Sequence, residues 1–243
     1  MKLEFLGTGA ADWVQPEPEG EYRRLTSTLI DGALLVDLTM GTLERLAHTE
    51  EVTDLLITHS HSDHFDPAAV AALAPKRVHV HEGWADRVSV PGVAVVPVRE
   101  EAPFEAAGHR IVALRGNHST EDRGEHTLHY LIEAGGKRLY YATDGAWLLY
   151  REAKLLRENP LDALVIDATI GDDREGDYRV FEHNSLPMVR IMEASMRKNG
   201  MLKADAPVFL THLARTLHPN QAALEAANAA PFVVCRDGLT AEI

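Results

Sequence analysis

Apolar side chains occur along this chain mostly in short runs, which predict many strands and few long helices. The first run, residues 2–6, alternates polar and apolar positions and predicts a strand that ends at Gly7-Thr8-Gly9. The dipeptides Asp31-Gly32 and Gly135-Gly136 each lie between two such runs, and dipeptides of this kind favour hairpin turns. Further strands are predicted at residues 54–58, 77–80, 93–98, 110–115, 163–167 and 208–211, with a closing hairpin at 232–234 and 239–242.

One helix is well delimited by its end signals. Residues 186–198 form this helix, because Ser185 can cap its start, Pro187 suits its first turn and Gly200 follows its end. Shorter helices are predicted at residues 42–47, 67–73, 147–157 and 220–229. Since hairpin-linked strands alternate with helices in both halves, we expect two mixed sheets packed face to face with helices on the outer faces. This αββα sandwich, an α/β (α+β) fold, would span residues 1–243 as one domain.

Composition narrows the classes of partner. Acidic residues outnumber basic ones by 37 to 24, which gives a net charge of −13, and a groove for nucleic acid needs the opposite balance. The single cysteine, Cys235, excludes an internal disulfide and a zinc site made of several thiolates. No charged leader with an apolar stretch opens the chain, and no apolar run reaches about 18 residues. We therefore expect a soluble cytoplasmic protein without a membrane segment.

Residues 58–66, THSHSDHFD, crowd metal-ligand residues at the end of a predicted buried strand. His59 and His61 are two apart and leave a strand end on the same face, while Asp63 and His64 follow in the next turn. Imidazole and carboxylate suit zinc, manganese or iron. The alternative is a solvated histidine-rich loop, but a chance H-x-H-x-D-H in the chain is on the order of one in a thousand.

Three more ligand residues follow predicted strands elsewhere in the chain: His118, Asp144 and His212. Each alone has an ordinary alternative, as a loop histidine, a turn former before glycine and a capped polar residue, respectively. Together with the histidine-rich motif, they indicate metal binding at the ends of several strands.

The order of these motifs resembles the metallo-β-lactamase superfamily, from Gly7-Thr8-Gly9 through THSHSDH, His118 and Thr143-Asp144-Gly145 to His212. Within it, the chain is most similar to PhnP-type phosphodiesterases, which open phosphoribosyl 1,2-cyclic phosphate. Subgroup features are Asn117-His118-Ser119 and the pair Glu182-His183. The chain departs from that subgroup in residues 12–24, which form a polar loop without the cysteine cluster that holds a structural zinc.

The resemblance implies a fold, a cofactor and a ligand set. The cofactor would be two divalent metal ions, zinc or manganese, with iron as a further option. One metal would be bound by His59, His61 and His118, the second by Asp63, His64 and His212, and Asp144 would bridge the two. His183 matches the residue that binds the substrate phosphate or protonates the leaving group in PhnP-type enzymes and in tRNase Z.

These residues suggest roles in hydrolysis. Two metals about 3.5–4 Å apart can hold one hydroxide and lower the pKa of the parent water towards about 7. Asp63 is placed to bind metal and orient that hydroxide, and His183 is a candidate proton donor. His183 also precedes the helix at residues 186–198, whose exposed N–H groups favour an anion.

The leading hypothesis is therefore a hydrolase for a small phosphodiester, cyclic or open. A lactonase or a glyoxalase II-like thioesterase on the same metal site is the main alternative. A tRNase Z-like nuclease is disfavoured by the net charge, and a non-catalytic metal-binding protein by the full ligand set. The sequence leaves a homodimer open. His79 and His81 form a second H-x-H, but no further ligand follows them at suitable spacing. The sequence predicts surface or hairpin positions for His48, His109, His126 and His129, and for His218 a loop position or a place in the lining of the pocket. The acidic run at 171–177 is interpreted as a solvated loop or a lid.

Overall fold

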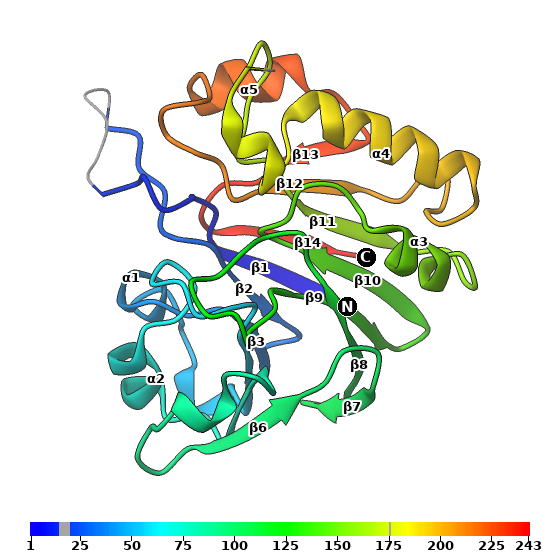
Figure 1. The fold of residues 1–243 in the computed structure, drawn as a ribbon. Helices are drawn as coiled ribbons and strands as arrows, with labels where there is room; N and C mark the ends of the chain where they lie inside the picture. The colour runs from blue at the N-terminus through cyan, green and yellow to red at the C-terminus, as the bar shows by residue number, and fades with distance from the viewer. Residues whose placement is uncertain (15–19, 175) are drawn as a thin grey trace.

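Two sheets of seven strands each form the centre of the molecule (Figure 1). The computed structural model describes residues 1–14, 20–174 and 176–243. In spatial order, the first sheet contains β14 (Leu239–Glu242), β1 (Lys2–Gly7), β2 (Ser27–Ile30), β3 (Leu34–Val36), β4 (Asp54–Leu56), β5 (Arg77–His81) and β6 (Ala94–Val98). The second contains β13 (Phe232–Val234), β12 (Val208–Thr211), β11 (Ala163–Asp167), β10 (Lys137–Ala142), β9 (Leu128–Ala134), β8 (His109–Arg115) and β7 (Pro103–Ala106).

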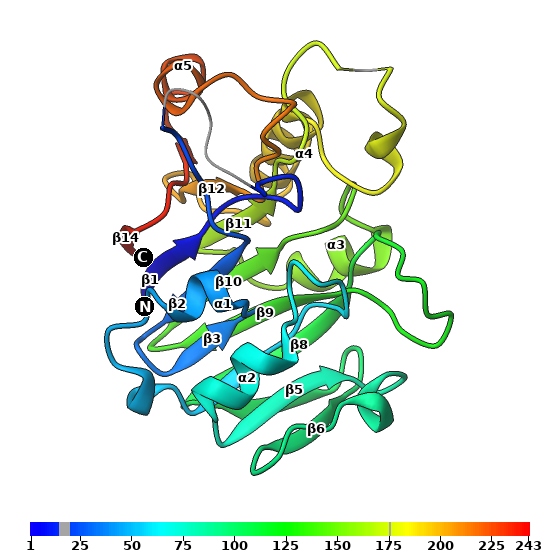
Figure 2. The ribbon, with the colours of Figure 1, turned by 90° about the vertical axis from the view of Figure 1, so that its left-hand side faces the viewer.

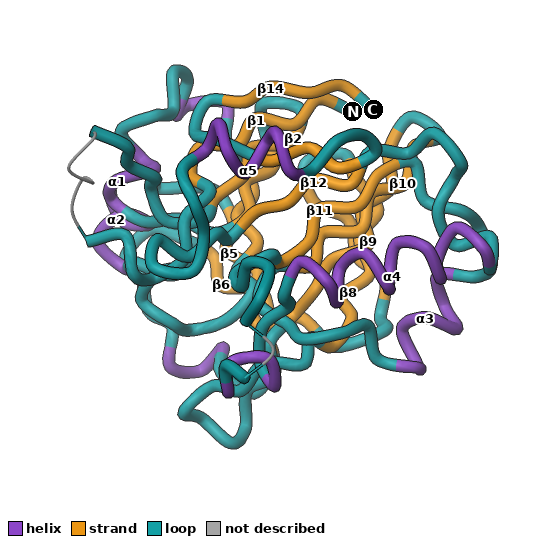
Figure 3. Tube along the Cα trace, turned by 90° about the horizontal axis from the view of Figure 1, so that it is seen from above, coloured by secondary structure: helices purple, strands orange, loops and turns teal. Residues whose placement is uncertain are grey.

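Helices cover the outer faces of both sheets. They are α1 (Met40–Leu43), α2 (Pro67–Leu73), α3 (Tyr150–Leu156), α4 (Leu186–Lys198) and α5 (Gln221–Ala227), with short 3-10 turns at Thr49–Glu51, Ala85–Arg87 and Tyr178–Phe181. Seen from above, α1 and α2 lie on one side of the strands and α3 and α4 on the opposite side (Figure 3).

Three apolar layers hold this arrangement together. Between the sheets, Phe5 contacts Phe209 with ring centroids 5.3 Å apart, and both belong to one buried cluster. Outside the first sheet, Val70 of α2 packs into a second cluster. Outside the second sheet, Met192 of α4 and Leu156 of α3 pack into a third. The predicted αββα sandwich is therefore confirmed.

The hairpins predicted at the two glycine-containing dipeptides are confirmed. Asp31 and Gly32 both have positive φ, 48° and 73°, as the tight hairpin turn requires, and β2 pairs antiparallel with β3. The helix predicted at residues 186–198 is confirmed at both ends, with Ser185 as its N-cap. The first residues of the chain lie beside the last ones, because β1 pairs with β14 (Figure 2).

The predicted closing hairpin is wrong. β13 pairs parallel with β12 in the second sheet, whereas β14 pairs antiparallel with β1 in the first. The apolar pattern indicates strands there but does not specify their partners. The predicted helix at residues 147–157 begins only at Tyr150, since Trp147 has a φ of 62°, which an α-helix does not allow. Strand β7 was missed, because its sequence PFEA is short and begins with proline.

Strand direction brings the site residues together. β10, β11 and β12 run parallel, and β8 points the same way because β9 runs antiparallel to both β8 and β10. The carboxyl ends of β8, β10 and β12 therefore lie at one edge of the second sheet, where residues 118, 144 and 212 follow them. Residues 15–19, within the predicted loop at 12–24, and residue 175 of the acidic run lie outside the described residues.

Candidate metal centre

The loop after β4 is held in place by a buried aspartate. Oδ1 of Asp37 accepts a hydrogen bond from the backbone N–H of Thr58 at 2.8 Å, and its Oδ2 accepts one from Nδ1 of His64 at 2.7 Å. Asp37 is fully buried and has a φ of 56°. This one carboxylate therefore fixes both the start of the histidine-rich loop and the ring orientation of His64.

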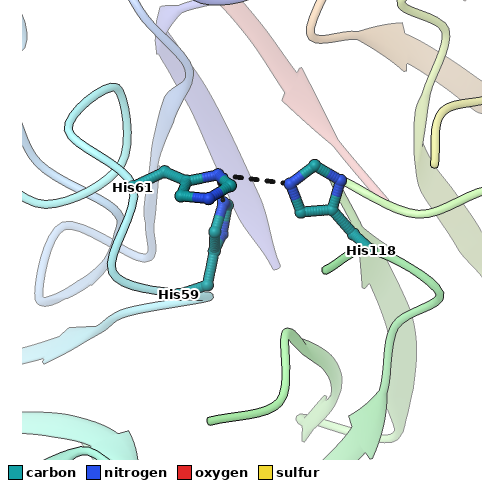
Figure 4. A group of neighbouring side chains, drawn as sticks. All are labelled: His59, His61 and His118. Atoms are coloured by element: carbon teal, nitrogen blue, oxygen red, sulfur yellow. Dashed lines mark hydrogen bonds between the residues drawn. The ribbon is translucent and has the colours of Figure 1, made fainter. Parts of the chain in front are cut away.

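Three histidine rings meet in the first group of ligand candidates (Figure 4). Nδ1 of His61 lies 2.9 Å from Nε2 of His59 and 3.2 Å from Nε2 of His118. One donor atom from each residue lies within 4.8 Å of the other two. His118 comes from the second sheet and the other two from the first, so the group spans the gap between the sheets.

A second group lies next to the first and contains Asp63, His64, Asp144 and His212. Oδ2 of Asp63 lies 3.4 Å from Nε2 of His64 and 3.5 Å from Nε2 of His212. Oδ2 of Asp144 lies 2.6 Å from Nε2 of His64 and 3.5 Å from Nε2 of His59. Asp144 therefore lies between the two groups. The structure thus brings together all seven residues that the sequence singled out as ligands.

The hydrogen bonds of the imidazole rings fit metal binding. In four of the five candidate ligand histidines, Nδ1 faces an oxygen: Thr58 Oγ1 for His59, Asp37 Oδ2 for His64, the Glu182 carbonyl for His118 and Thr169 Oγ1 for His212. In His61, Nδ1 is instead the atom that faces the other two rings. A neutral imidazole that donates from Nδ1 presents a lone pair at Nε2, and metal-bound histidines usually have this arrangement. In these four rings, Nε2 is the atom that points into the two groups.

The charges of the site also favour cations. Burial lowers the pKa of His59 well below its usual value, so this ring is neutral at pH 7. Burial opposes the charge of Asp144, but the neighbouring histidines His212 and His64 hold its pKa well below the usual range. Oδ1 of Asp144 is buried and lies 3.0 Å from Nδ1 of His212 and 3.4 Å from Nδ1 of His183, without a well-formed hydrogen bond among the described residues. A buried carboxylate beside the neutral ring of His59 and the Nε2 atoms of the other rings makes a suitable donor set for divalent metal.

The backbone of the site is strained at two of these residues. Asp144 and His212 have φ values of 53° and 56°, a region that costs a residue other than glycine of the order of 1 kcal/mol. Nε2 of His129 lies 3.2 Å from the carbonyl oxygen of Asp144, which helps to hold that turn. A Cβ atom at Gly145 or Gly116 would lie 2.7 Å from the His129 ring, so both glycines leave room for it.

The sequence predicts a surface or hairpin position for His129; the residue lies in β9 of the β9–β10 hairpin, but it is not at the surface. The residue is buried, burial lowers its pKa to about 4, and its Nδ1 lies 3.0 Å from the Tyr140 hydroxyl. The only sequence signal for this role is the pair of glycines that surround the ring, Gly116 and Gly145, and neither is close to His129 in the sequence.

His183 lies beside the second group and, with Asp144, Asp167 and His212, forms a further cluster that could hold a metal ion. Its Nδ1 donates to Oδ2 of Asp167 at 2.8 Å, and its ring stacks on that of His212 with centroids 5.4 Å apart. Burial lowers the pKa of His183, but the charge of Asp167 outweighs burial and raises it to about 9. Asp167 itself is fully buried and also accepts from the backbone N–H groups of Thr169 and Asn184, at 3.0 Å each.

A cleft of about 360 Å³ opens beside the metal groups and is bounded on one side by His118. Its lining includes Arg115, Asn117, Ser119, Arg123, Glu125, His126, Leu149, Phe181 and Glu182. Glu182 accepts a hydrogen bond from the Ser119 hydroxyl, which ties the segment before α4 to the loop that carries His118.

The second H-x-H motif has a different environment. Nε2 of His79 donates a hydrogen bond to Oδ1 of Asp54 at 2.7 Å, outside the metal groups, and burial lowers the pKa of this ring. His81 lies near Glu100 and His126, which the sequence spacing did not indicate. However, Nδ1 of His81 accepts the N–H of Gly83, so in a neutral ring its Nε2 carries the proton. This cluster therefore lacks the arrangement that four of the five candidate ligand histidines share.

No helix in the described part of the chain is long and apolar enough to span a membrane. No curated protein sequence matches the chain. Its fold is shared by the metallo-β-lactamase fold protein YhfI from Bacillus subtilis, at 15% identity and a TM-score of 0.74, covering 99% of each chain. It is also shared by a diphosphatase of the PhnP family, at 18% identity and a TM-score of 0.72, covering 100% of this chain and 97% of the other. The short form of human tRNase Z is 19% identical with a TM-score of 0.70, covering 100% and 99%.

The family itself follows from the sequence match. Residues 25–213 match the model of the beta-lactamase superfamily domain, a range that contains every ligand candidate described above. The structural likenesses support the same fold over the whole described chain. The chain therefore belongs to the beta-lactamase superfamily and has the metallo-β-lactamase fold that its motifs predict.

Proposed function

We propose that this chain is a dinuclear metal-dependent phosphodiesterase that acts on small phosphodiesters, cyclic ones included. The observation that carries the proposal is the place of His183, next to the two ligand groups and hydrogen-bonded to the buried Asp167. A protonated imidazole there suits the negative phosphoryl group and the alkoxide that must leave with a proton. A thiolate leaving group, in contrast, needs no proton.

The donor set supports two divalent ions, zinc or manganese, with iron as an alternative. His59, His61 and His118 would hold one ion, and Asp63, His64 and His212 the other, with Asp144 shared between them. When bound, the pair would supply an activated water at neutral pH and offset charge on the phosphoryl oxygens. Superfamily members are mostly metal-dependent hydrolases, which agrees with this assignment.

The protein's own groups would do the remaining chemistry. Asp63 is only partly buried and faces the ring nitrogens of His64 and His212, so it would orient the attacking water. His183 would hold a phosphoryl oxygen or give a proton to the leaving oxygen from Nε2, because its Nδ1 is engaged by Asp167. Thr169 supports both His183 and His212 through one hydroxyl, at 3.2 and 2.8 Å from the two Nδ1 atoms.

The test compares substrates under one metal loading. Protein reconstituted with zinc or manganese is assayed with bis-p-nitrophenyl phosphate, cyclic nucleotides, a lactone and a thioester. We expect phosphodiester cleavage to have the highest kcat/KM. Turnover of the lactone or the thioester without detectable phosphodiester cleavage would reverse the assignment in favour of the lactonase or thioesterase alternative.

The proposal includes a single hydrolase domain over residues 1–243, a small-molecule substrate rather than nucleic acid, and a cytoplasmic location. Light scattering of the metal-loaded protein would test whether two copies form a homodimer.

A further inference from the structure

The turn that carries His59 and His61 is tied to the second sheet by a buried glutamate. The hydroxyl of Ser60, which lies between these two ligand candidates, donates a hydrogen bond to Oε2 of Glu125 at 2.5 Å. Glu125 is 4% exposed, and its Oε1 is buried without a hydrogen-bond partner among the described residues. A short hydrogen bond to a carboxylate is about twice as strong as one between neutral groups, so this contact joins the two segments strongly.

Glu125 belongs to the segment that also positions His118. Two residues after Glu125, the hydroxyl of Thr127 donates a hydrogen bond to the carbonyl oxygen of His118 at 3.1 Å. On the other side, the backbones of Gly124 and Gly83 lie so close that a Cβ atom at Gly83 would be 1.8 Å from the Gly124 carbonyl oxygen. The backbone is therefore held on both sides of Glu125, which makes its carboxylate an acceptor with a fixed position.

His61 depends on this contact more than the other ligand candidates do. The other four histidines have an oxygen at Nδ1 that orients the ring, whereas Nδ1 of His61 faces the rings of His59 and His118 (Figure 4). Within the described ranges, no hydrogen bond orients Nε2 of His61. The position of this ring is therefore set by the backbone beside it, which Ser60 and Glu125 hold.

Two further contacts join the same segments, but both lie before the first ligand candidate. The backbone N–H of Leu128 donates to the carbonyl oxygen of Thr58 at 2.8 Å, and the Tyr130 hydroxyl donates to that of Ile57 at 2.6 Å. Of these three contacts, the bond from Ser60 is the one that lies between two ligand candidates.

The first ligand group also contains less negative charge than the second. It consists of three histidines, which bind metal as neutral rings, whereas the second group includes Asp63 and Asp144. Glu125 places a carboxylate against Ser60, one residue from two of these rings. A carboxylate near neutral ligands stabilises a bound cation, so Glu125 would favour a metal ion at this position through charge as well as through geometry.

We propose that Glu125 is a positioning residue for the first metal position: its bond to Ser60 holds the turn at residues 59–61 against the segment of His118 and sets the metal affinity of that position alone. The inference rests on the proposed dinuclear site and goes beyond it, because it makes the affinities of the two positions separately adjustable. Loss of a group that orients metal ligands typically lowers metal affinity by about 10- to 100-fold. We expect a loss of that size at the first position and none at the second.

Calorimetric titration of the metal-free full chain with Co²⁺ tests the inference. Ser60→Ala and Glu125→Ala remove the bond from either end, and each should weaken one of the two binding events by about 10- to 100-fold. That event should be the one that His61→Ala removes. The event that His212→Ala removes should keep its affinity within experimental error.

A double-mutant cycle and a conservative variant separate positioning from general structural damage. If the two side chains act through their mutual bond, Ser60→Ala/Glu125→Ala should bind the first ion no more weakly than either single variant. Glu125→Gln should retain part of the affinity, because its amide oxygen can still accept from the Ser60 hydroxyl. The matched control is Glu121→Gln, which removes an exposed acid from the same loop and should leave both binding events unchanged.

The outcomes separate this inference from the proposed function. Two binding events that Ser60→Ala leaves unchanged, equal weakening of both events, or additive losses in the double variant would overturn the inference alone. Ser60 is only partly buried, so Ser60→Ala decides the matter even if Glu125→Ala does not fold. Absence of Co²⁺ binding by the unmodified protein would overturn the proposed function, and this inference with it.

Discussion

Replacing His183 by alanine separates its role from those of the metal ligands. The side chain is 15% exposed, and its Nδ1 makes a 2.8 Å hydrogen bond to the buried carboxylate of Asp167. His183→Ala leaves Oδ2 of Asp167 with the Thr169 hydroxyl as its remaining donor. Loss of one charge-assisted hydrogen bond costs about 1.5–3 kcal/mol, which urea unfolding would measure as reduced stability of a still folded protein.

The effect on rate should depend on the leaving group. Positioned acid catalysis contributes about 10²- to 10⁴-fold, or roughly 3–5 kcal/mol of barrier. For a diester with an alkoxide leaving group, we expect His183→Ala to lower kcat by a factor in that range. For bis-p-nitrophenyl phosphate the loss should be much smaller, because p-nitrophenolate leaves without a proton. Steady-state kinetics on the two substrates, with metal content measured on the same samples, would check this.

Two results would refute the reasoning. Equal losses on both substrates would show that His183 does not protonate the leaving group. Loss of a metal ion in His183→Ala would make this residue a ligand, a role that its proximity to Asp144 and His212 makes worth testing. The variant His183→Asn is a useful companion, because its amide can still donate to Asp167 and should retain more stability than alanine while losing the same rate.

Three further predictions concern metal content and stability. His59→Ala should reduce bound metal and activity on every substrate, whereas His126→Ala should leave the metal content unchanged. Elemental analysis of the reconstituted variants would check this, and equal metal contents in the two would contradict it. Burial opposes the charge of Asp54, but hydrogen bonds from Arg77 and His79 outweigh burial and lower its pKa to about 2. The ion pair of Asp54 with Arg77 therefore stabilises the fold above about pH 4, and this stabilisation is lost as the pH falls towards 2. Asp54→Asn should then cost about 2 kcal/mol at pH 7 and little near pH 2, and an equal cost at both values would exclude this origin. Gly145→Ala should destabilise the protein by roughly 1–3 kcal/mol, because the new Cβ would lie 2.7 Å from His129, and an unchanged melting temperature would show that the ring can move.

The fold was predictable where local patterns determine the structure. The turn at Asp31-Gly32 and the ends of α4 depend on residues next to each other, and both are confirmed. The pairing of β13 and β14 depends instead on which distant strand edge is free, and the predicted hairpin between them is wrong. Local apolar patterns specify that a strand forms, and tertiary packing specifies its partner.

In the candidate site, the ligand residues were predictable from the sequence and the residues that orient them were not. Ligand residues stand out in the sequence because their chemistry is rare at strand ends, and parallel strands then bring those ends together. The residues that orient them were not predicted. Asp37, Thr58 and Asp167 are common residue types in ordinary strand and loop sequences, and only the fold shows that each one fixes a ring nitrogen or a backbone turn at the centre.

The two groups of ligand candidates take residues from both sheets, and this has a mechanical consequence. His59 and Asp63 follow a strand of the first sheet, while His118, Asp144 and His212 follow strands of the second. A chain with one cysteine has no internal disulfide, so metal ions held here would be cross-links between its two halves. Removal of the metal ions by a chelator should therefore loosen the edge of the sandwich at which the ligand candidates lie. Amide hydrogen exchange should then be faster at that edge than at the opposite one. In this protein, the groups proposed to perform the chemistry would also hold the two halves of the sandwich together.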